Sequence, residues 1–447
     1  MHSHPPKIAY LTAGAAGMFC GSCLHDNALA KELISLGHDC LLIPVYTPIR
    51  TDDSDVSIDR VFMGGVNVYL QQKFPWLAYT PKWLDSFLNQ PWIIRALTKN
   101  AGKTSPKLLG PLTLSMLRGT QGRQRKEFLR MLEWLEADVR PDVVILTNLL
   151  IGGGIPDLRR RLDASIWVTL QGDDIFIDSL LPRHREGVVE AMRKLVPLVD
   201  GFIVHSRSYG TKMEQLLGIP AEKVHVIPLG IPTRDFLTPP LPEHDSNPKE
   251  PKRDEDAPFT IGYFARMATE KGLHRLVDAF VEIAKKPQYS HVRLKMAGWM
   301  GPQHEAYWNE QLAKLRIPEL EGRWEYVGAI DRKEKTAFLQ SIDLFCVPTV
   351  YEEPKALFLL EAIASGVPYV QPAHGAFPEI HARVHSTEGA PVLGRLFQPD
   401  APDHLRMELI RMIEERTTRI APTASLLEEI GIQKHAERVA SLVTAKR

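Results

Sequence analysis

Short hydrophobic runs recur along the first half of the chain, and segments with the apolar spacing of a helix lie between them. The runs lack apolar–polar alternation, which is typical of strands buried on both faces of a parallel sheet. Residues 25–37 show the helical spacing, because Leu29, Leu33 and Leu36 share one face and Gly37 follows as a stop signal. The pattern predicts a doubly wound α/β domain. Its strands are expected within 7–13, 40–46, 143–149, 166–172, 201–206 and 224–230.

The alternation stops at residues 237–258, which are rich in proline and charge and have almost nothing to bury. Such a composition predicts a linker or a surface loop. Strands and helices then resume, so we expect one domain over 1–236 and a second over 259–426. The final helical segment, 427–447, is expected to pack back on the first domain. Strands of the second domain are expected within 260–265, 292–298, 324–329, 344–349 and 369–373.

A helical insertion at 74–138 is predicted to interrupt the first domain. Its first part, 74–99, holds three of the chain's eight tryptophans, Trp76, Trp83 and Trp92. The stretch from Arg95 to Arg130 carries nine Lys or Arg residues against one acid, Glu127. Two interpretations remain open. The tryptophans belong to an ordinary helical core, or residues 76–130 form a face that binds the acceptor or a membrane surface, where tryptophans gather beside cations.

The length, charge and cysteine content of the chain exclude several kinds of protein. The chain has 447 residues, 44% hydrophobic and 24% charged, which suits a soluble protein of about two to four domains. Its formal net charge is zero, so we expect no nucleic-acid partner. Four cysteines do not form a disulfide framework in so long a chain. No signal peptide and no apolar run of about 18 residues is present, and a cytoplasmic protein is expected.

Two cations follow the first predicted strand of the second domain. Arg266 and Lys271 flank a strand-to-helix turn and stand five residues apart. A guanidinium fork and a compact ammonium that converge on one point suit a diphosphate, and the helix N-terminus adds partial positive charge there. Solvated surface charge in a loop is the alternative.

Two acidic residues follow a later strand. Pro354 fits the start of a helix and not its interior, which places Glu353 at the mouth of the loop and Glu361 one to two turns into the helix. Glu361 stands in the apolar stretch LFLLEAIA, where an unpaired carboxylate would be costly. A ribose diol would satisfy it, as in dinucleotide-binding folds, and so would a buried ion pair.

These features together resemble the family 4 nucleotide-sugar glycosyltransferases, which have the two-domain GT-B fold. The stretch 374–380, HGAFPEI, is also similar to the family's Gly-Gly-x-Pro-Glu turn, with Ala376 in place of the second glycine. Residues 354–356, Pro-Lys-Ala, depart from the usual Gly-Phe-Gly. The resemblance covers nearly all of the second domain and the ends of the first. Its main residues, in the family's order and spacing, are Arg266, Lys271, Gly272, Glu353, Glu361, Gly366 and Pro368.

The resemblance implies two Rossmann-like domains that face a central cleft. It implies a retaining hexosyltransferase that uses a nucleotide diphosphate sugar, whether UDP, GDP or ADP, and needs no metal or other cofactor. Arg266 and Lys271 would bind the diphosphate and stabilise the leaving group. Glu353 would meet the donor sugar and Glu361 the ribose. Backbone N–H groups would approach the phosphates from Lys355, Ala356, Leu357 and Phe358.

Acceptor contacts are expected at the ends of first-domain strands. Thr147 and Gln171 stand where the family often has histidine, and Gln171 can hydrogen-bond a sugar hydroxyl but cannot carry a proton. Asp173, beside Asp174, either binds acceptor hydroxyls or caps a loop. His205 is either a core residue or points into the cleft.

The stretch AGAAGMFCGSCLHDN contains a Cys-x-x-Cys pair, Cys20 and Cys23. A zinc site would need two further ligands, and no second Cys-x-x-Cys or His-x3-His pair exists. A thioredoxin-like motif would fit the local pattern but not the residues that follow. In the resembled family this position is the glycine loop that faces the donor, where Gly21 stands. A redox role for the two sulfurs stays open.

A metal site, another enzyme of the same fold and a non-catalytic binding protein have less support in the sequence. Asp-x-Asp letters at 52–55 and 254–256 lie in a loop and in the linker, and Arg266 with Lys271 already supplies positive charge, so we expect no metal site. A sugar-nucleotide epimerase or a phosphorylase of the same fold is one alternative. A non-catalytic nucleotide-sugar-binding protein is the other.

Overall fold

The computed structural model describes residues 5–14, 21–49, 54–58, 61–62, 106–236, 257–387, 394–401, 403–417 and 419–445. Residues 74–105 of the predicted insertion and most of the predicted linker lie outside these ranges. The chain divides into two compact units, which we call unit 1 and unit 2. Unit 1 comprises Met1–Pro228 and His435–Arg447, and unit 2 comprises Leu229–Lys434.

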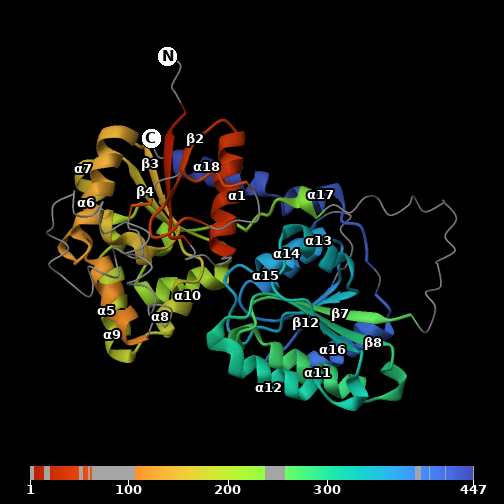
Figure 1. The fold of residues 1–447 in the computed structure, drawn as a ribbon. Helices are drawn as coiled ribbons and strands as arrows, with labels where there is room; N and C mark the ends of the chain where they lie inside the picture. Colours follow the sequence, from red (N-terminus) through yellow and green to blue (C-terminus); the bar gives the residue numbers. More distant parts are fainter. Residues whose placement is uncertain are drawn as a thin grey trace. The chain divides into compact units, whose positions relative to one another are not determined.

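Unit 1 is built on a six-stranded parallel sheet in the order β2-β1-β3-β4-β5-β6 (Figure 1). Each strand overlaps one of the predicted hydrophobic runs. β3 and β5 are buried along their whole length, which explains why their sequences show no alternation. The strands are β1 Lys7–Thr12, β2 Asp39–Pro44, β3 Val143–Leu146, β4 Ser165–Thr169, β5 Gly201–Val204 and β6 Val224–Val226.

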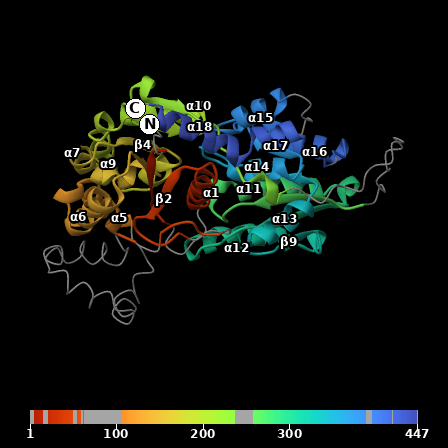
Figure 2. The same ribbon diagram turned by 90° about the horizontal axis from the view of Figure 1, so that it is seen from above.

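Helices cover both faces of this sheet, as predicted. Figures 1 and 2 show α1 on one side of β1–β4 and α6 with α7 on the other. The described part of the insertion is helical and forms α5 and α6. The helices of unit 1 are α1 Gly21–Ser35, α5 Pro106–Leu117, α6 Arg125–Trp134, α7 Ile155–Arg161, α8 Asp173–Asp178, α9 Pro182–Arg193, α10 Arg207–Leu217 and, from His435 onward, α18 Ile432–Thr444.

Unit 2 has a second six-stranded parallel sheet in the order β12-β11-β10-β7-β8-β9. Five of its strands were predicted. The sixth, β12, was missed because its four residues, GRLF, include a glycine and an arginine and are buried only at the two ends. The strands are β7 Phe259–Phe264, β8 Val292–Ala297, β9 Trp324–Tyr326, β10 Leu344–Phe345, β11 Tyr369–Pro372 and β12 Gly394–Phe397.

The helices of unit 2 also lie on both faces of their sheet. Figure 1 shows α11, α12 and α16 on one face and α13, α14 and α15 on the other. Their bounds are α11 Leu273–Ala284, α12 Glu305–Leu315, α13 Arg332–Gln340, α14 Leu357–Ala364, α15 Phe377–Ser386, α16 His404–Glu414 and α17 Ala424–Glu429.

The strand order reverses once in each sheet. In unit 1 the reversal falls between β1 and β3, and in unit 2 between β7 and β10. Doubly wound sheets bind ligands beyond the carboxyl ends of the strands at such a point. The segments that follow β1, β3, β7 and β10 are therefore the places where the fold favours a site.

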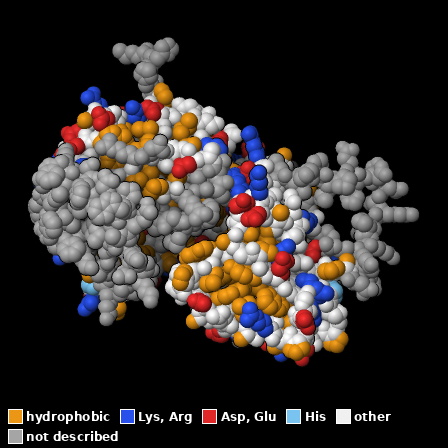
Figure 3. Space-filling model, in the orientation of Figure 1, with side chains coloured by type: hydrophobic (Ala, Val, Ile, Leu, Met, Phe, Trp, Pro, Cys, Tyr) orange, Lys and Arg blue, Asp and Glu red, His pale blue; other side chains and the backbone are white. Residues whose placement is uncertain are grey.

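Charges of both signs are interspersed on the described surface in the view of Figure 3, in keeping with a net charge of zero. Within the described ranges, no helix has the length and apolar character needed to cross a membrane.

Candidate functional site

Lys271, Tyr351 and Glu353 form a buried cluster at the reversal point of unit 2. Lys271 Nζ donates to the Tyr351 hydroxyl and to Glu353 Oε2, both at 2.6 Å. The Tyr351 hydroxyl donates to the same Oε2 at 2.5 Å. Lys271 follows β7, whereas the other two residues follow β10. The structure therefore brings together Lys271 and Glu353, which the sequence singled out, and adds Tyr351, which it did not.

The neighbours of Glu353 keep this buried carboxyl ionised. Burial opposes its ionisation, but the charge and hydrogen bond of Lys271, the Tyr351 hydroxyl and the charge of Lys355 outweigh that effect, and the pKa of Glu353 is lowered. Burial, followed by the Glu353 charge, raises the pKa of Tyr351 well above its ordinary value. At neutral pH the cluster thus holds an ammonium, a neutral phenol and a carboxylate.

Two glycines allow the segments of the cluster to meet. Gly272 has φ +73°, and a Cβ there would collide with the carbonyl oxygen of Pro348, just after β10. Gly375 has φ +58°, and a Cβ would lie 2.6 Å from the backbone N and O of Glu353. The next amide, Ala376 N, donates to the Glu353 carbonyl oxygen at 2.8 Å. Close backbone approach therefore requires glycine at both positions.

Helix α14 begins directly after the cluster. Its N-cap is Ala356, a non-glycine residue in the left-handed region with φ 49° and ψ 50°. The Ala356 N–H lies 3.4 Å from Glu353 Oε1, and Lys355 is 8% exposed. The amides of Leu357 and Phe358 belong to the first turn of the helix, whose partial positive charge favours an anion.

Arg266 lies on a more exposed part of the same turn. Its guanidinium Nη2 is 3.1 Å from Glu270 Oε1, and 45% of its side chain is exposed. Arg266 and Lys271 thus both follow β7, but in the described residues Arg266 pairs with Glu270 and is not part of the buried cluster.

Glu361 has a buried ionic partner, one of the two alternatives that the sequence left open. Lys335 Nζ lies 2.7 Å from Glu361 Oε1, and each side chain is 7% exposed. Lys335 comes from α13 and Glu361 from α14. Sequence reasoning missed Lys335, although a lysine at a buried position of an amphipathic helix is a signal for such a pair.

In unit 1, Thr147 and Gln171 converge on Asp26, a fully buried residue of α1 that sequence reasoning missed. Tyr10 and Thr12 donate to its carboxylate at 2.7 Å, Thr147 donates at 2.6 Å and Gln171 Nε2 at 3.2 Å. Burial opposes ionisation, but His25 and these hydroxyls outweigh it, and the pKa of Asp26 is lowered. These residues lie at or follow the carboxyl ends of β1, β3 and β4, where the fold favours a site.

His205 belongs to a buried cluster with His25 and His435. The ring centroid of His25 lies 5.1 Å from that of His205 and 4.9 Å from that of His435. His435 Nδ1 lies 2.8 Å from the carbonyl oxygen of Pro228, which can only accept, so this nitrogen carries the proton. When the pair is neutral, His25 Nε2 therefore donates to His435 Nε2, at 3.1 Å.

Asp173 makes a capping contact, again one of the alternatives left open. Its Oδ2 accepts from the backbone N–H of Leu149 at 2.9 Å. Burial raises the pKa of Asp173 to about 7, despite backbone hydrogen bonds that lower it. The hydroxyl of Tyr209 accepts from the N–H groups of Gly172 and Asp173 and donates to Asp174 Oδ1.

Gly21 is the first residue of α1, at the position expected for the glycine loop. Cys23 is 2% exposed, and Cys20 lies outside the described residues. Within the described ranges, no group of three or more His, Cys, Asp or Glu side chains is arranged to hold a metal ion.

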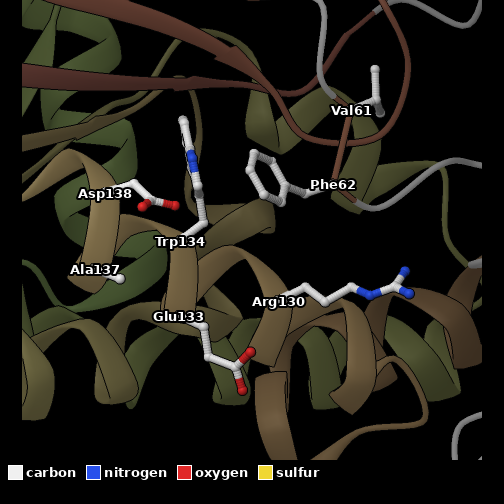
Figure 4. Close-up of a pocket in the computed structure, with 7 residues that line it drawn as sticks. All are labelled: Val61, Phe62, Arg130, Glu133, Trp134, Ala137 and Asp138. Atoms are coloured by element: carbon white, nitrogen blue, oxygen red, sulfur yellow. The ribbon is translucent and has the colours of Figure 1, made fainter. Parts of the chain in front are cut away.

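The described end of the insertion borders a cavity of about 470 Å³ beside α6 (Figure 4). The rings of Phe62 and Trp134 pack with centroids 4.9 Å apart, and Arg130 and Glu133 lie nearby. Helix α6 leads toward the amino end of β3, whereas Thr147 follows the carboxyl end. This cavity is therefore separate from the residues around Asp26.

Two family models match the chain over adjacent segments. Residues 27–230 match the model described as "Glycosyl transferase 4-like domain", and residues 258–415 match the model described as "Glycosyl transferases group 1". The first match lies in unit 1 apart from its last two residues, and the second lies wholly in unit 2.

Curated relatives match over shorter stretches. The chain is 30% identical over 172 residues to a putative colanic acid biosynthesis glycosyltransferase, WcaL, of Escherichia coli K12, which covers 37% of this chain and 38% of the relative. It is 25% identical over 236 residues to an MMP α-(1→4)-mannosyltransferase of Mycolicibacterium hassiacum, covering 51% of this chain and 52% of the relative. The matches thus span about half, or less, of these relatives' length.

Solved structures match over almost the whole chain. HepE of Anabaena, in complex with UDP, matches with a TM-score of 0.63 and 16% identity, covering 98% of this chain and 100% of that one. Sucrose-phosphate synthase of Thermosynechococcus elongatus matches with a TM-score of 0.64 and 16% identity, covering 98% of both chains. At this identity the likeness concerns the fold. Because both units are matched by glycosyl transferase models and their sheets follow these structures, the chain belongs to the group 1 glycosyl transferases and has the GT-B fold.

Proposed function

We propose that the protein is a retaining glycosyltransferase that moves a hexose from a nucleoside diphosphate sugar to an acceptor hydroxyl without an essential metal. The observation that carries the proposal is the cluster of Lys271, Tyr351 and Glu353 at the reversal point of the unit 2 sheet. Membership in the group 1 family supports the same reaction class.

Lys271 and Arg266 would bind the donor diphosphate. An ammonium has three hydrogens, and Tyr351 and Glu353 accept two of those of Lys271, so one remains for a phosphate oxygen. Arg266 adds an exposed guanidinium group five residues before Lys271. The first amides of α14 follow directly after the segment that carries Glu353. Negative charge on the leaving phosphate grows in the transition state, and fixed cations there lower the barrier.

Glu353 would hold the donor sugar through its hydroxyls. Its lowered pKa keeps it an acceptor at neutral pH, and its Oε2 already accepts two hydrogen bonds that fix its orientation. HepE, whose fold is similar, is known in complex with UDP and with UDP-glucose, which makes UDP the first nucleotide to test.

The acceptor would bind unit 1 near the carboxyl ends of its strands. Thr147, Gln171, Asp173 and His205 are the residues proposed for this side, and Gly21, at the start of α1, is proposed to face the donor. All of them lie at or follow these strand ends, although Thr147 and Gln171 also hydrogen-bond to Asp26.

We further propose a cytoplasmic enzyme whose residues 76–130 contact anionic membrane surfaces. Flotation with anionic liposomes at low salt checks that contact, and absence of the protein from the lipid fraction contradicts it.

Acceptor-dependent release of nucleoside diphosphate tests the proposed reaction. The purified chain is incubated with UDP-glucose, UDP-galactose, GDP-mannose or ADP-glucose, together with a panel of sugar phosphates and oligosaccharides, with and without EDTA. We expect one donor to release its diphosphate only when an acceptor is present, at the same rate in EDTA. Proton NMR of the product should show the anomeric configuration of the donor.

The same assay separates the alternatives. An epimerase would interconvert donors without an acceptor, and a binding protein would release nothing. Replacing Lys271 by methionine should lower turnover at least about tenfold, because the leaving group loses a fixed cation. Lys286→Met, at an exposed lysine just beyond α11, is the matched control and should leave turnover unchanged.

A further inference from the structure

We infer that Tyr351 is a positioning residue of the donor site, which holds Glu353 so that Oε1 is the carboxylate oxygen left for the donor sugar. The inference rests on the proposed function, in which Glu353 meets that sugar. Both short hydrogen bonds to the carboxylate end on the other oxygen: Lys271 Nζ donates to Oε2 at 2.6 Å and the Tyr351 hydroxyl at 2.5 Å. In the part of the chain that the structure describes, Oε1 has only the Ala356 N–H, at 3.4 Å.

The loop that carries Tyr351 is fixed by hydrogen bonds of its main chain. The Val350 N–H donates to the carbonyl oxygen of Glu270 at 3.0 Å, which ties the loop to the turn after β7. The Thr349 hydroxyl donates to the carbonyl oxygen of Tyr351 at 3.1 Å. The phenol therefore extends from a fixed main chain, and its hydroxyl can hold a carboxylate in one orientation as well as contact it.

The Tyr351 hydroxyl suits this role because it both accepts and donates a hydrogen bond. It accepts from Lys271 Nζ at 2.6 Å and donates to Glu353 Oε2. Without it, the ammonium and the carboxylate would remain as a simple ion pair, in which the carboxylate can turn about its terminal bond and exchange its two oxygens. The hydroxyl adds a second fixed direction at Oε2 and so distinguishes the two oxygens.

Lys271 has supports that do not depend on this hydroxyl. Its Nζ lies 5.0 Å from the ring centroid of Tyr351 and 5.2 Å from that of Phe358, the second residue of α14. The substitution Tyr351→Phe keeps the first ring, and Glu353 can still accept from the ammonium. Removing the hydroxyl alone should therefore loosen Glu353 more than it moves Lys271. The sugar and the diphosphate of a donor should consequently respond differently to this change.

Calorimetric titration of the full chain with a nucleotide sugar and with its nucleoside diphosphate tests the inference. UDP-glucose, UDP-galactose, GDP-mannose and ADP-glucose are titrated first, and the tightest is then compared with its own diphosphate in wild type and Tyr351→Phe. We expect the variant to bind the nucleotide sugar at least about fivefold more weakly and the diphosphate within about twofold of wild type. Equal losses for both ligands, or no loss for either, would overturn the inference.

Tyr289→Phe is the matched control. The Tyr289 hydroxyl also donates to a glutamate, Glu414 Oε1, at 2.6 Å, but it stands just before the amino end of β8. Because ligands of this fold bind at the carboxyl ends of the strands, the control should leave both affinities unchanged.

A double-mutant cycle with Glu353→Gln separates positioning from a general loss of packing. Tyr351→Phe should weaken nucleotide-sugar binding in the wild-type background and change it by less than about twofold in the Glu353→Gln background, because the oriented carboxylate is then already gone. Circular dichroism checks that each variant is folded. The same loss in both backgrounds would mean that Tyr351 does not act through Glu353.

The pH dependence of binding is a second readout. Burial opposes the ionisation of Glu353, but Lys271, the Tyr351 hydroxyl and Lys355 outweigh it and lower the pKa. Tyr351→Phe removes one of these contributions, so the pKa of Glu353 should rise. Nucleotide-sugar binding that is lost on acidification should therefore be lost at a higher pH in the variant than in wild type. Loss at the same pH in both would contradict the inference.

The outcomes also separate this inference from the proposed function. If Glu353→Gln weakens nucleotide-sugar binding and Tyr351→Phe does not, the inference fails and the proposed function stands. If Glu353→Gln leaves that binding unchanged, the proposed sugar contact fails and the inference fails with it. Absence of binding of every nucleotide sugar and diphosphate to the wild type would overturn both.

Discussion

At the scale of single residues, three buried carboxyls show how neighbours decide charge. Glu353 and Asp26 have lowered pKa values because an ammonium, an imidazole or hydroxyl donors outweigh burial. Asp173 receives only backbone N–H groups and has Asp174 as its neighbour, and burial raises its pKa to about 7. Two carboxyls are therefore ionised at neutral pH, and the third exchanges its proton near pH 7.

Replacing Asp173 by asparagine is expected to stabilise the protein more at pH 8 than at pH 5. The pKa of Asp173 is about 7 in the folded chain against an ordinary value of 3.8. Between these values the folded state holds a proton that the unfolded state lacks, so stability falls as the pH rises through this window. Asparagine keeps an acceptor for the Leu149 amide and carries no charge.

Urea unfolding of wild type and Asp173→Asn at both pH values measures this effect. The gain in free energy of unfolding should be larger at pH 8 by about 2 kcal/mol. An equal change at the two pH values would show that Asp173 is already ionised in the folded protein at pH 5.

Sequence reasoning found the residues whose spacing along the chain is itself informative. Lys271 and Glu353 belong to such a pattern, and the structure joins them. Tyr351 and Asp26 were missed because their roles come from contacts between residues far apart in the chain, whereas Lys335 was missed although its buried position on an amphipathic helix was a signal. Tyr351 meets Lys271 across 80 positions, and Asp26 meets Thr147 across 121. No local periodicity encodes such meetings.

At the scale of elements, strands were predicted well where apolar or aromatic residues follow one another in the sequence. Every strand of unit 1 overlaps a predicted run. Strands buried along their whole length, such as β3 and β5, read as continuous apolar stretches. Partial burial alone does not hide a strand, because β6 and β9 were predicted although no residue of either is fully buried. β12 was missed because a glycine and an arginine open its four-residue sequence. The start of α14 was placed too near Pro354, since the left-handed Ala356 delays the helix to Leu357.

Replacing Ala356 by glycine is expected to stabilise unit 2 by up to about 1 kcal/mol. An alanine in the left-handed region is strained, and glycine removes that strain at a smaller entropic cost. The free energy of urea unfolding measures the change.

Gly272→Ala is the opposite case, because φ is +73° and a Cβ would meet the Pro348 carbonyl. It should destabilise by about 2 kcal/mol or more, and a destabilised Ala356→Gly variant would contradict the account.

At the scale of the whole molecule, unit 1 is built from two segments that are separated in the sequence by the whole of unit 2. The chain leaves unit 1 after Pro228 and returns at His435. The returning segment buries Ala436, Val439 and Val443. His435 also hydrogen-bonds to the Pro228 carbonyl oxygen at 2.8 Å and contacts His25 at 3.1 Å. Unit 1 therefore depends on residues that lie more than 200 positions after its main segment.

A chain ending at Lys434 should lose stability in unit 1 and retain nucleotide binding in unit 2. Truncation removes His435 and the buried apolar residues after it, whereas the Lys271 cluster keeps all its contacts. Calorimetry should show a lowered unfolding temperature for part of the transition, with affinity for UDP, GDP or ADP within about twofold of the full chain. Unchanged unfolding of the truncated chain would mean that α18 contributes nothing to unit 1.

The central claim is that the Lys271 cluster binds the diphosphate of a nucleotide sugar. Calorimetric titration of UDP, GDP and ADP into the full chain and into Lys271→Met tests it most directly. The account predicts saturable binding of at least one diphosphate to the wild type and at least about tenfold weaker binding to the variant, with Lys286→Met unchanged. No binding to the wild type, or equal affinity in wild type and Lys271→Met, would contradict it.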